Sequence, residues 1–390
     1  MNARIVIVGG GPVGLSFALA ASRLPGAEVV VVERAASGQG PLPQPFDHRV
    51  YALSPASMAF LDEMGASPDT ADRARTAPVR AMQLWGDGKG ELDFGHGQPL
   101  ATIVEHAAVM YALETRLALD GRVEMKRGAA PVSMTATDAA GNVNSREISL
   151  ADGSSLKADL LIAADGSRSQ IRQWAGIPVR SKDYDSDGVV ANFSCERAHG
   201  DVARQWFKTD SVLAYLPLPG RHISIVWSVA REAAAELARL PEAEFCARVA
   251  EAGGRELGDL SLVSPVARFP LARTTAENWV QPGLALMGDA AHAVHPLAGQ
   301  GVNLGFADAR KMFEVLRDKS KFSRIGDLAL LRQYERAQRE AARAVGEVTD
   351  RLRSLYMSEM AAARWLRNDG MRLVNRLPAA KSVLVDYATR

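Results

Sequence analysis

The sequence predicts an α/β protein with a parallel sheet, a second domain built on antiparallel sheet, and a helical C-terminal region. Two short apolar runs near the start, at 4–8 and 29–32, are typical of buried parallel strands, and a helical pattern lies between them. Residues 181–271 alternate apolar and polar side chains between turns, which indicates antiparallel strands. From Leu328 onward the apolar spacing is helical with few breaks, so we expect the chain to end in helices.

Composition narrows the class of protein. The chain has 390 residues, more than one ordinary core holds, so we expect two closely connected domains. Its 46 basic and 45 acidic residues give a net charge of +1, which argues against a nucleic-acid partner. The two cysteines, Cys195 and Cys246, do not form a disulfide framework and fit a reducing cytoplasm. We find no secretory signal and no apolar run of about 18 residues, so we expect a cytoplasmic protein without a transmembrane helix.

The first strand runs directly into the glycine-rich turn GGGPVG. Pro12 opens a helix that we expect to end near Leu24, and Glu33 follows the second strand. This is the spacing of a dinucleotide-binding fingerprint, in which glycines allow close approach to a pyrophosphate and the acid binds a ribose. Glu33 favours a free 2′-hydroxyl, as in FAD or NAD, and the alternative is a chance glycine turn. The fingerprint glycines are Gly9, Gly11 and Gly14.

The next segment contains a loop, two helical patterns and a hairpin. Residues 35–46 are rich in Gly, Pro, Ser and Gln and predict a loop. Arg49 then leads into VYALSPASMAFLDEMG, which we expect to form one amphipathic helix ending near Gly65. Arg49 either holds a phosphate or is simply solvated. Residues 79–94 predict a hairpin, and residues 103–119 predict a further helix.

A third apolar strand, Ala158 to Ile162, follows a region of strands and turns at 123–156. It ends in Asp165 and Gly166, and Arg172 lies in the helix that we expect next. An Asp–Gly pair at this place is either a second polar contact to the bound nucleotide or an ordinary turn.

The predicted antiparallel domain faces the substrate. Its strands are expected at 189–193, 205–208, 212–216 and 222–229, with a helix at 241–252. Tyr215 and His222 either touch substrate or serve the strand core, and we favour the core.

The stretch from Leu284 to Gly305, LALMGDAAHAVHPLAGQGVNLG, combines a buried strand, an acid and a glycine-flanked turn before a helix. Asp289 follows the strand and can accept hydrogen bonds from sugar or ribityl hydroxyls. Gly299 and Gly301 flank Gln300, and the helix from Val302 presents unpaired N–H groups suited to an electron-rich ligand. His292 and His295 have no third ligand at suitable spacing, so we expect no metal site.

Three motifs therefore stand in order: GGGPVG with Glu33, LLIAADGSRSQIR, and LALMGDAAHAVHPLAGQGVNLG. Together they resemble the single-component FAD-dependent aromatic hydroxylases of the p-hydroxybenzoate-hydroxylase-like fold, over nearly the whole chain. DHRVYALS, YLPLPGRHISIVWS, RFPLARTTAENW and HPLAGQGVNLGFADA are similar to the ubiquinone-biosynthesis hydroxylases in particular. The resemblance implies a Rossmann-like FAD-binding domain and hydroxylation of a ring carbon of a polyprenylated phenol or quinol, with NAD(P)H and O2 as co-substrates.

The resemblance also implies roles for matching residues. The turn glycines would approach the FAD pyrophosphate, Glu33 the adenosine ribose, Arg49 the ribityl–pyrophosphate region and Asp289 the ribityl chain. Residues 296–303 would line the isoalloxazine ring, so the flavin-facing loop is named in place of a catalytic side chain: Pro296, Gly299 and Gln300. The family usually has Glu-Asn where this chain has Glu105-His106, which leaves the hydrogen bond at His106 open. The full set expected to bind FAD is Gly9, Gly11, Pro12, Gly14, Glu33, Arg34, Arg49, His106, Asp165, Gly166, Gly288, Asp289, Pro296, Gly299, Gly301, Val302 and Asn303.

The domain division that follows is discontinuous. We expect the FAD-binding domain at 1–78, 98–180 and 265–320, the substrate domain at 79–97 and 181–264, and the C-terminal helical region at 321–390. Since the chain has one dinucleotide fingerprint, we expect NAD(P)H to bind weakly and transiently. Three alternatives stay open: a hydroxylase of a small soluble aromatic compound, a flavin-dependent reductase of isoprenoid double bonds, and a flavin-stabilised assembly subunit without turnover.

The C-terminal region raises the question of a membrane. Residues 351–390 include eight basic and three acidic residues, with apolar side chains at near-helical spacing. Such a helix either packs its apolar face on its own domain or lies on an anionic bilayer. Because the implied substrate resides in the bilayer, we predict peripheral association at the inner face of the cell membrane, where other ubiquinone-biosynthesis proteins are expected partners.

Overall fold

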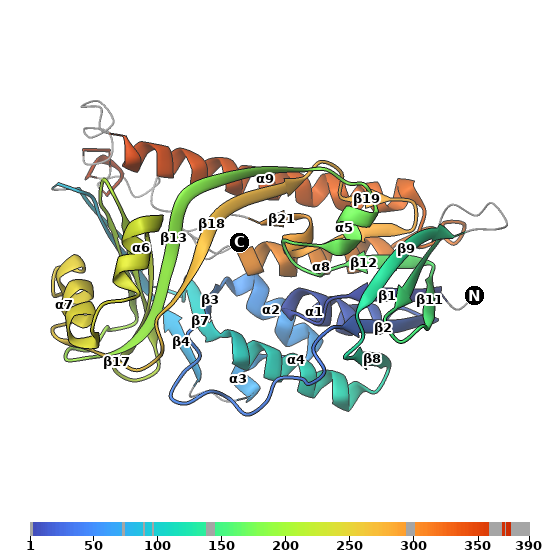
Figure 1. Ribbon diagram of the computed structural model, residues 1–390, viewed down its shortest axis with the longest axis horizontal. Coiled ribbons are helices and arrows are strands. Elements are labelled where there is room, and N and C mark those ends of the chain that lie inside the picture. Colours follow the sequence, from blue (N-terminus) through green and yellow to red (C-terminus); the bar gives the residue numbers. More distant parts are fainter. Residues whose placement is uncertain are drawn as a thin grey trace.

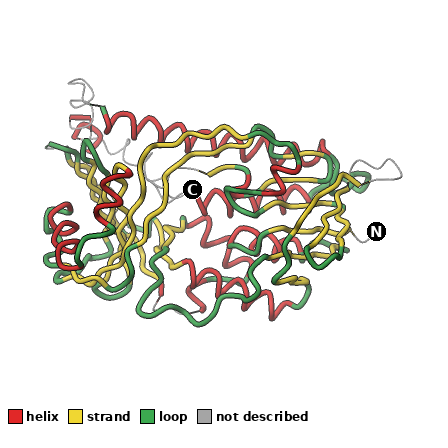
Figure 2. Tube along the Cα trace, viewed as in Figure 1, coloured by secondary structure: helices red, strands yellow, loops and turns green. Residues whose placement is uncertain are grey.

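The computed structural model describes residues 3–71, 75–88, 90–95, 97–137, 145–293, 301–358, 369–370 and 372–375. Figure 1 shows an elongated molecule with an α/β unit at one end and an antiparallel sheet at the other. Two long strands, β13 (Val179–Cys195) and β18 (Ala267–Ala276), join the two ends, as the yellow tubes in Figure 2 show. The α/β class with a second antiparallel sheet is therefore confirmed.

The α/β unit contains, within the described residues, a six-stranded sheet in the order β19-β20-β12-β1-β2-β8. All its neighbouring strands run parallel except β19, which is antiparallel to β20. Residues 5–7, 30–31 and 160–163 are fully buried, because helices cover the sheet and only apolar side chains tolerate that position. The strands are β1 (Ala3–Val8), β2 (Ala27–Glu33), β8 (Val123–Arg127), β12 (Leu160–Ala163), β19 (Val280–Gln281) and β20 (Leu284–Leu286).

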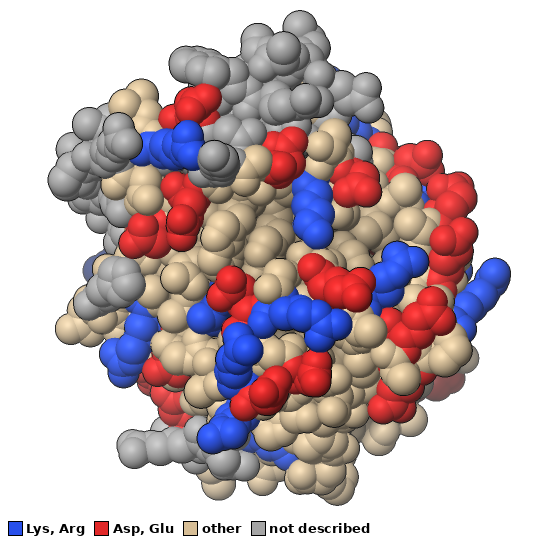
Figure 3. All heavy atoms as spheres, turned by 90° about the vertical axis from the view of Figure 1, so that its left-hand side faces the viewer, with Lys and Arg blue, Asp and Glu red and all other residues tan. Residues whose placement is uncertain are grey.

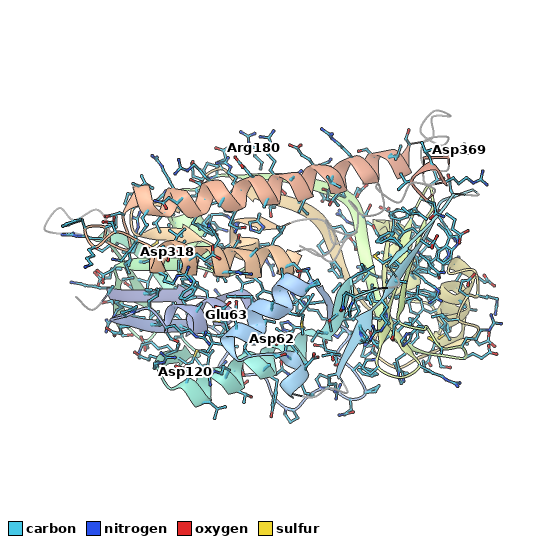
Figure 4. The ribbon with its side chains drawn as sticks, turned by 180° about the vertical axis from the view of Figure 1, so that it is seen from behind. Asp62, Glu63, Asp120, Arg180, Asp318 and Asp369 are labelled. Carbon is cyan, nitrogen blue, oxygen red and sulfur yellow. The ribbon has the colours of Figure 1, made fainter. Side chains whose placement is uncertain are left out.

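Helices pack on this sheet and on each other. α1 (Pro12–Ala21) contacts both α4 (His106–Asp120) and α8 (Gly301–Arg317), and α8 also contacts α9 (Leu328–Met357). Figure 4, which views the molecule from behind, shows α9 running from the end where Asp318 lies to the end where Asp369 lies. Shorter helices are α2 (Pro55–Met64), α3 (Pro68–Ala71), α5 (Gln170–Trp174) and the 3₁₀ turn η2 (Gly288–Ala290).

Two small sheets flank the α/β unit. One contains β9 (Pro131–Thr137), β10 (Ser145–Leu150) and β11 (Ser155–Ala158). The other has the order β3-β7-β4, from β3 (Val50–Leu53), β7 (Ala101–Glu105) and β4 (Thr76–Val79). The second of these places the start of β3 beside the start of α4, which matters for the site.

The large sheet has the order β21-β18-β13-β16-β15-β14-β5-β6 among the described residues, with β17 also paired to β13. Its neighbours are antiparallel except for β14 and β5. Helices α6 (Arg231–Leu237) and α7 (Glu242–Ala252) cover its outer side (Figure 1). The remaining strands are β5 (Ala81–Trp85), β6 (Glu91–Gly95), β14 (Val202–Phe207), β15 (Val212–Leu218), β16 (His222–Ala230), β17 (Leu260–Leu262) and β21 (His292–Ala293).

Most expected elements are present, and two were wrong. Residues 50–65 do not form one helix, since Val50–Leu53 is strand β3 and the helix begins at Pro55. Likewise Ala101–Glu105 is strand β7, and the helix expected from 103 begins at His106. In both cases pairing of β3 with β7 satisfies the backbone in a way that the local apolar spacing did not reveal.

The membrane question is only partly addressed by the fold. No helix of the described residues is long and apolar enough to cross a membrane. The predicted surface helix at 351–390 lies largely outside the described residues. On the end face in Figure 3, the drawn basic and acidic side chains are interspersed, so the described residues there form no continuous basic patch.

Candidate active site

The glycine turn is the tightest place in the α/β unit. Gly9 has φ of +112°, and a Cβ there would lie 2.2 Å from the carbonyl oxygen of Ala164. A Cβ on Gly14 would lie 2.0 Å from the carbonyl oxygen of Gly9. A Cβ on Gly11, by contrast, would meet no atom within 4 Å. Gly9 and Gly14 therefore let β1, β12 and α1 approach one another, while Gly11 leaves open space before the N-terminus of α1.

Glu33 lies beside this turn. One carboxylate oxygen accepts from the backbone N–H of Gly10 at 2.5 Å, and the other accepts from Ala35 at 2.8 Å. The neighbouring Arg34 is exposed and donates to the side chain of Gln170 at 2.7 Å. The acid is thus held against the glycine turn, where the fingerprint predicts it, and Arg34 extends toward the start of α5.

Asp165 lies after β12, next to the same turn. Its Oδ2 accepts from the backbone N–H groups of Gln170 and Ile171 at 2.9 and 3.3 Å, which caps α5. Its Oδ1 is buried and has no hydrogen-bond partner among the described residues. Burial raises the pKa of this carboxyl. Because Oδ1 has no hydrogen-bond donor among the described residues and lies beside the glycine turn, it suits a ligand that carries a hydrogen-bond donor. Gly166 follows with φ of +82°.

Arg172 connects this region to the turn that carries Asp289. It donates to the carbonyl oxygens of Ala290 and Ser167, at 2.8 and 2.7 Å. Burial lowers the pKa of its guanidinium, so its hydrogen bonds to these carbonyls compensate for lost water. The Arg172 side chain therefore links the turn after β12 to η2. The sequence had predicted only that Arg172 lies in a helix.

Asp289 lies in the turn η2, directly after β20. Its side chain is exposed, yet desolvation by the surrounding protein raises the pKa of its carboxyl, while His292 and Arg49 act to lower it. Gly288, just before it, has φ of +59°, and its N–H donates to Oδ2 of Asp308 at 2.9 Å.

Arg49, Tyr51 and His106 lie close to one another where β3 meets the start of α4. The Arg49 guanidinium carbon lies 5.4 Å from the centre of the Tyr51 ring, and the Tyr51 hydroxyl lies 2.8 Å from Nδ1 of His106. The backbone N–H of His106 also donates to the carbonyl oxygen of Arg49 at 2.8 Å. The charge of Asp289 contributes to the raised pKa of Tyr51, about 12, which burial chiefly causes. Residues from β3 and α4, far apart in sequence, therefore lie together, and their roles toward FAD stay predictions.

Buried polar contacts hold the segment before Arg49 in place. Arg75 donates to both carboxylate oxygens of Glu105 at 3.1 and 3.2 Å, and to the carbonyl oxygen of Pro45 at 2.7 Å. Asp47 accepts from the N–H of Ala107 at 3.2 Å, at the start of α4, and Asn192 donates to the Asp47 carbonyl. No local pattern had indicated Arg75 or Asn192, because their partners lie far away along the chain.

The N-terminus of α8 contains three of the residues expected to bind FAD. A Cβ on Gly301 would meet no atom of the described residues within 4 Å, and Val302 is half-buried. The Asn303 side chain is occupied within the protein, since it accepts from Ser54 N–H at 3.0 Å and donates to the Ala52 carbonyl at 2.8 Å. These contacts tie the start of α8 to the segment around β3. Three further expected residues lie outside the described residues: Pro296, Gly299 and Gln300.

Two other expectations concern Tyr215 and the histidines considered as metal ligands. Tyr215 is buried, and its hydroxyl donates to the carbonyl of Val249 at 2.6 Å, as expected for a core residue. His292 is buried against Asp308, and no cluster of metal-binding side chains occurs among the described residues. His295, the other half of the metal question, lies outside them.

Comparison with known proteins identifies the class. A family model described as an FAD binding domain matches residues 2–349. The 3-demethoxyubiquinol 3-hydroxylase of Escherichia coli is 31% identical, over 98% of this chain and 97% of that protein. The ubiquinone hydroxylase UbiL of Rhodospirillum rubrum is 31% identical over 99% and 89%, and human mitochondrial COQ6, a ubiquinone biosynthesis monooxygenase, is 31% identical over 99% and 92%. The chain belongs to this family of FAD-dependent hydroxylases.

Solved structures agree on the fold of this hydroxylase. The p-nitrophenol 4-monooxygenase PnpA of Pseudomonas putida superposes with a TM-score of 0.76 at 21% identity, covering 99% of this chain and 97% of PnpA. A variant of Klebsiella pneumoniae HpxO complexed with FAD has a TM-score of 0.74 at 18% identity, covering 99% and 98%. The solved structures thus confirm the fold, and the family model and the relatives confirm the predicted family and the FAD cofactor, with NAD(P)H and O2 as co-substrates. The roles of individual residues stay predictions.

The first of those roles can be tested at Asp289. If it holds the ribityl chain, Asp289→Ala is expected to weaken FAD binding tenfold to a hundredfold, since a charge-assisted hydrogen bond contributes roughly 1.5–3 kcal/mol. The FAD content of the purified protein and a fluorescence titration measure this. The exposed Asp318→Ala is the matched control and should bind FAD normally. Unchanged affinity in Asp289→Ala would refute the assignment.

Proposed function

We propose that this FAD-dependent monooxygenase hydroxylates an aromatic ring carbon of a polyprenylated phenol or quinol in ubiquinone biosynthesis. One observation supports it above the others: three named relatives that act in ubiquinone biosynthesis or on ubiquinone compounds match almost the whole chain. The closeness of Asp165 to the glycine turn, and of Arg49 to Asp289, supports the same cofactor arrangement.

The fit of the cofactor rests on this chain's own groups. Gly11 leaves space for a pyrophosphate at the start of α1, and Oδ1 of Asp165 is an acceptor without a partner among the described residues. Arg49, His106 and Asp289 would hold the ribityl–diphosphate portion. When bound, FAD would supply the activation of O2 at the expense of NAD(P)H. The N–H groups at the start of α8 would stabilise negative charge on the ring, by about 0.3–1 kcal/mol.

The protein's remaining tasks are to orient the aromatic ring and to exclude water. We propose no general base, and the flavin-facing loop stays the candidate for positioning the ring. The division into FAD-binding, substrate and C-terminal regions stays part of the proposal, since β13 and β18 run continuously from one sheet region to the other.

Quinone profiling of a strain that lacks this protein is the deciding experiment. The strain should accumulate one intermediate that lacks a ring hydroxyl, and that intermediate identifies the step. Purified protein should consume O2 and oxidise NAD(P)H while adding one oxygen to the intermediate. Conversion of an isoprenoid double bond without O2 would instead favour the reductase, and complete lack of NAD(P)H oxidation would favour an assembly role.

We further propose that the protein associates with the membrane surface that contains such a substrate. The full chain is expected to sediment with anionic vesicles at low salt and to be released at high salt, because screening weakens attraction between exposed charges. A chain ending near Glu359 should sediment less. Equal sedimentation of both folded proteins, or of neither, would mean that the C-terminal region does not bind lipid.

A further inference from the structure

Tyr51 and His106 form a hydrogen-bonded pair at the junction of β3 and α4. The Tyr51 hydroxyl lies 2.8 Å from Nδ1 of His106, and the two rings meet edge to face with centres 5.7 Å apart. Tyr51 belongs to β3, and His106 is the first residue of α4. The pairing of Val50 with Glu105 in the sheet brings them together.

The protonation states of the pair follow from its surroundings. Burial chiefly lowers the pKa of His106 to about 4, and Arg49 lowers it further, so the imidazole is neutral near pH 7. The raised pKa of Tyr51 keeps its phenol protonated. A neutral imidazole has one donor and one acceptor nitrogen, and the hydrogen bond at one nitrogen selects the other's state.

Hydrogen-bond satisfaction selects the tautomer. Among the described residues the Tyr51 hydroxyl has no acceptor other than Nδ1 of His106. If Nδ1 carried the proton, the hydroxyl of the half-buried Tyr51 would be left without an acceptor among the described residues, which is costly. Nδ1 therefore accepts and Nε2 carries the proton. Nε2 has no partner within the described part of the chain, and the ring is half-buried.

We propose that Tyr51 is a positioning residue that locks His106 in its Nε2–H tautomer, so that His106 donates a hydrogen bond to an oxygen of the FAD ribityl–diphosphate chain. The charges of Arg49 and Asp289 both act on Tyr51, and that of Arg49 also acts on His106, so the donor lies among the groups proposed to hold that part of FAD. Since the donor role rests on the proposed cofactor placement, the Asp289→Ala measurement tests that placement separately.

A double-mutant cycle on FAD affinity tests the link. Tyr51→Phe keeps the ring and removes the hydroxyl, and is expected to raise the Kd for FAD about threefold to tenfold. His106→Asn supplies an amide that needs no tautomer selection, so its Kd should stay within about threefold of the native value. In the His106→Asn background, Tyr51→Phe should then change the Kd less than about twofold. His106→Ala should raise the Kd about tenfold, as the loss of the donor requires.

Nitrogen NMR of histidine-labelled full-length protein gives a second measurement that packing changes would not move. His106 should show the Nε2–H tautomer in the native chain and a mixture in Tyr51→Phe. Thermal unfolding of each variant identifies any that has lost its fold. If His106→Asn does not fold, His106→Gln replaces it as the amide variant. An equal effect of Tyr51→Phe in both backgrounds would overturn the proposal, as would native FAD affinity in His106→Ala or an Nδ1–H tautomer in the native chain.

Discussion

Gly14→Ala is expected to destabilise the α/β unit severely, whereas Gly11→Ala is expected to leave it folded and to weaken FAD binding. The Gly14 Cβ would lie 2.0 Å from a backbone carbonyl oxygen, which cannot move without displacing β1. Alanine favours a helix over glycine by about 1 kcal/mol, but overpacking against backbone costs about 3 kcal/mol or more, so the clash wins.

Gly11 is the matched control within the same turn. A methyl group there meets no protein atom within 4 Å, so the apoprotein should unfold at the native temperature. The methyl group would instead occupy the space proposed for the pyrophosphate, and the FAD Kd should rise about tenfold or more. Thermal unfolding of the apoproteins and FAD titration separate the two effects. Native stability in Gly14→Ala, or native FAD affinity in Gly11→Ala, would contradict this account of the turn.

Asp308→Ala is expected to cost about 3–5 kcal/mol of unfolding free energy, because it leaves a buried charge or donor without its partner. Nε2 of His292 lies 2.7 Å from Oδ2 of Asp308, and both side chains are about 1% exposed. Trp279 stacks on the imidazole, with ring centres 4.7 Å apart. The same carboxylate accepts from Gly288 N–H, so the variant should also loosen the turn before Asp289 and bind FAD less tightly.

The pH dependence of this pair has a definite sign. Burial lowers the pKa of His292, but the Asp308 carboxylate outweighs burial and the pKa is raised above the ordinary 6.5. The folded protein therefore holds a proton that the unfolded chain releases above about pH 6.5. The stabilisation is fully present below that pH and is lost as pH rises through the folded pKa.

Chemical denaturation between about pH 5.5 and 8.5 measures both effects. The native chain should lose stability from this pair as pH rises. In Asp308→Ala the group that chiefly raises the pKa of His292 is gone and only the charge of Asp289 still opposes burial, so the loss of stability with rising pH should become smaller. The exposed Asp318→Ala should leave the native slope unchanged. A native slope in Asp308→Ala would show that Asp308 does not raise the pKa of His292 as described.

The sequence by itself determined the parts that depend on local spacing and backbone conformation. The strand–glycine–helix order at Val8 to Pro12, the acid at Glu33 and the strand before Asp289 are all present where expected. Such features are readable because buried parallel strands must be apolar along their length, and because a turn as tight as the one at Gly9 admits no side chain.

Tertiary structure alone decided the contacts between distant segments. Val50–Leu53 is a strand because β7 pairs with it, and that pairing brings Tyr51 to His106, 55 positions away. Asp308 meets His292 only because α8 packs against the turn η2, and Arg75 meets Glu105 beside the loop before Arg49. These pairs have no sequence signal, since a hydrogen bond requires closeness in space and the chain's spacing does not record which segments the core brings together.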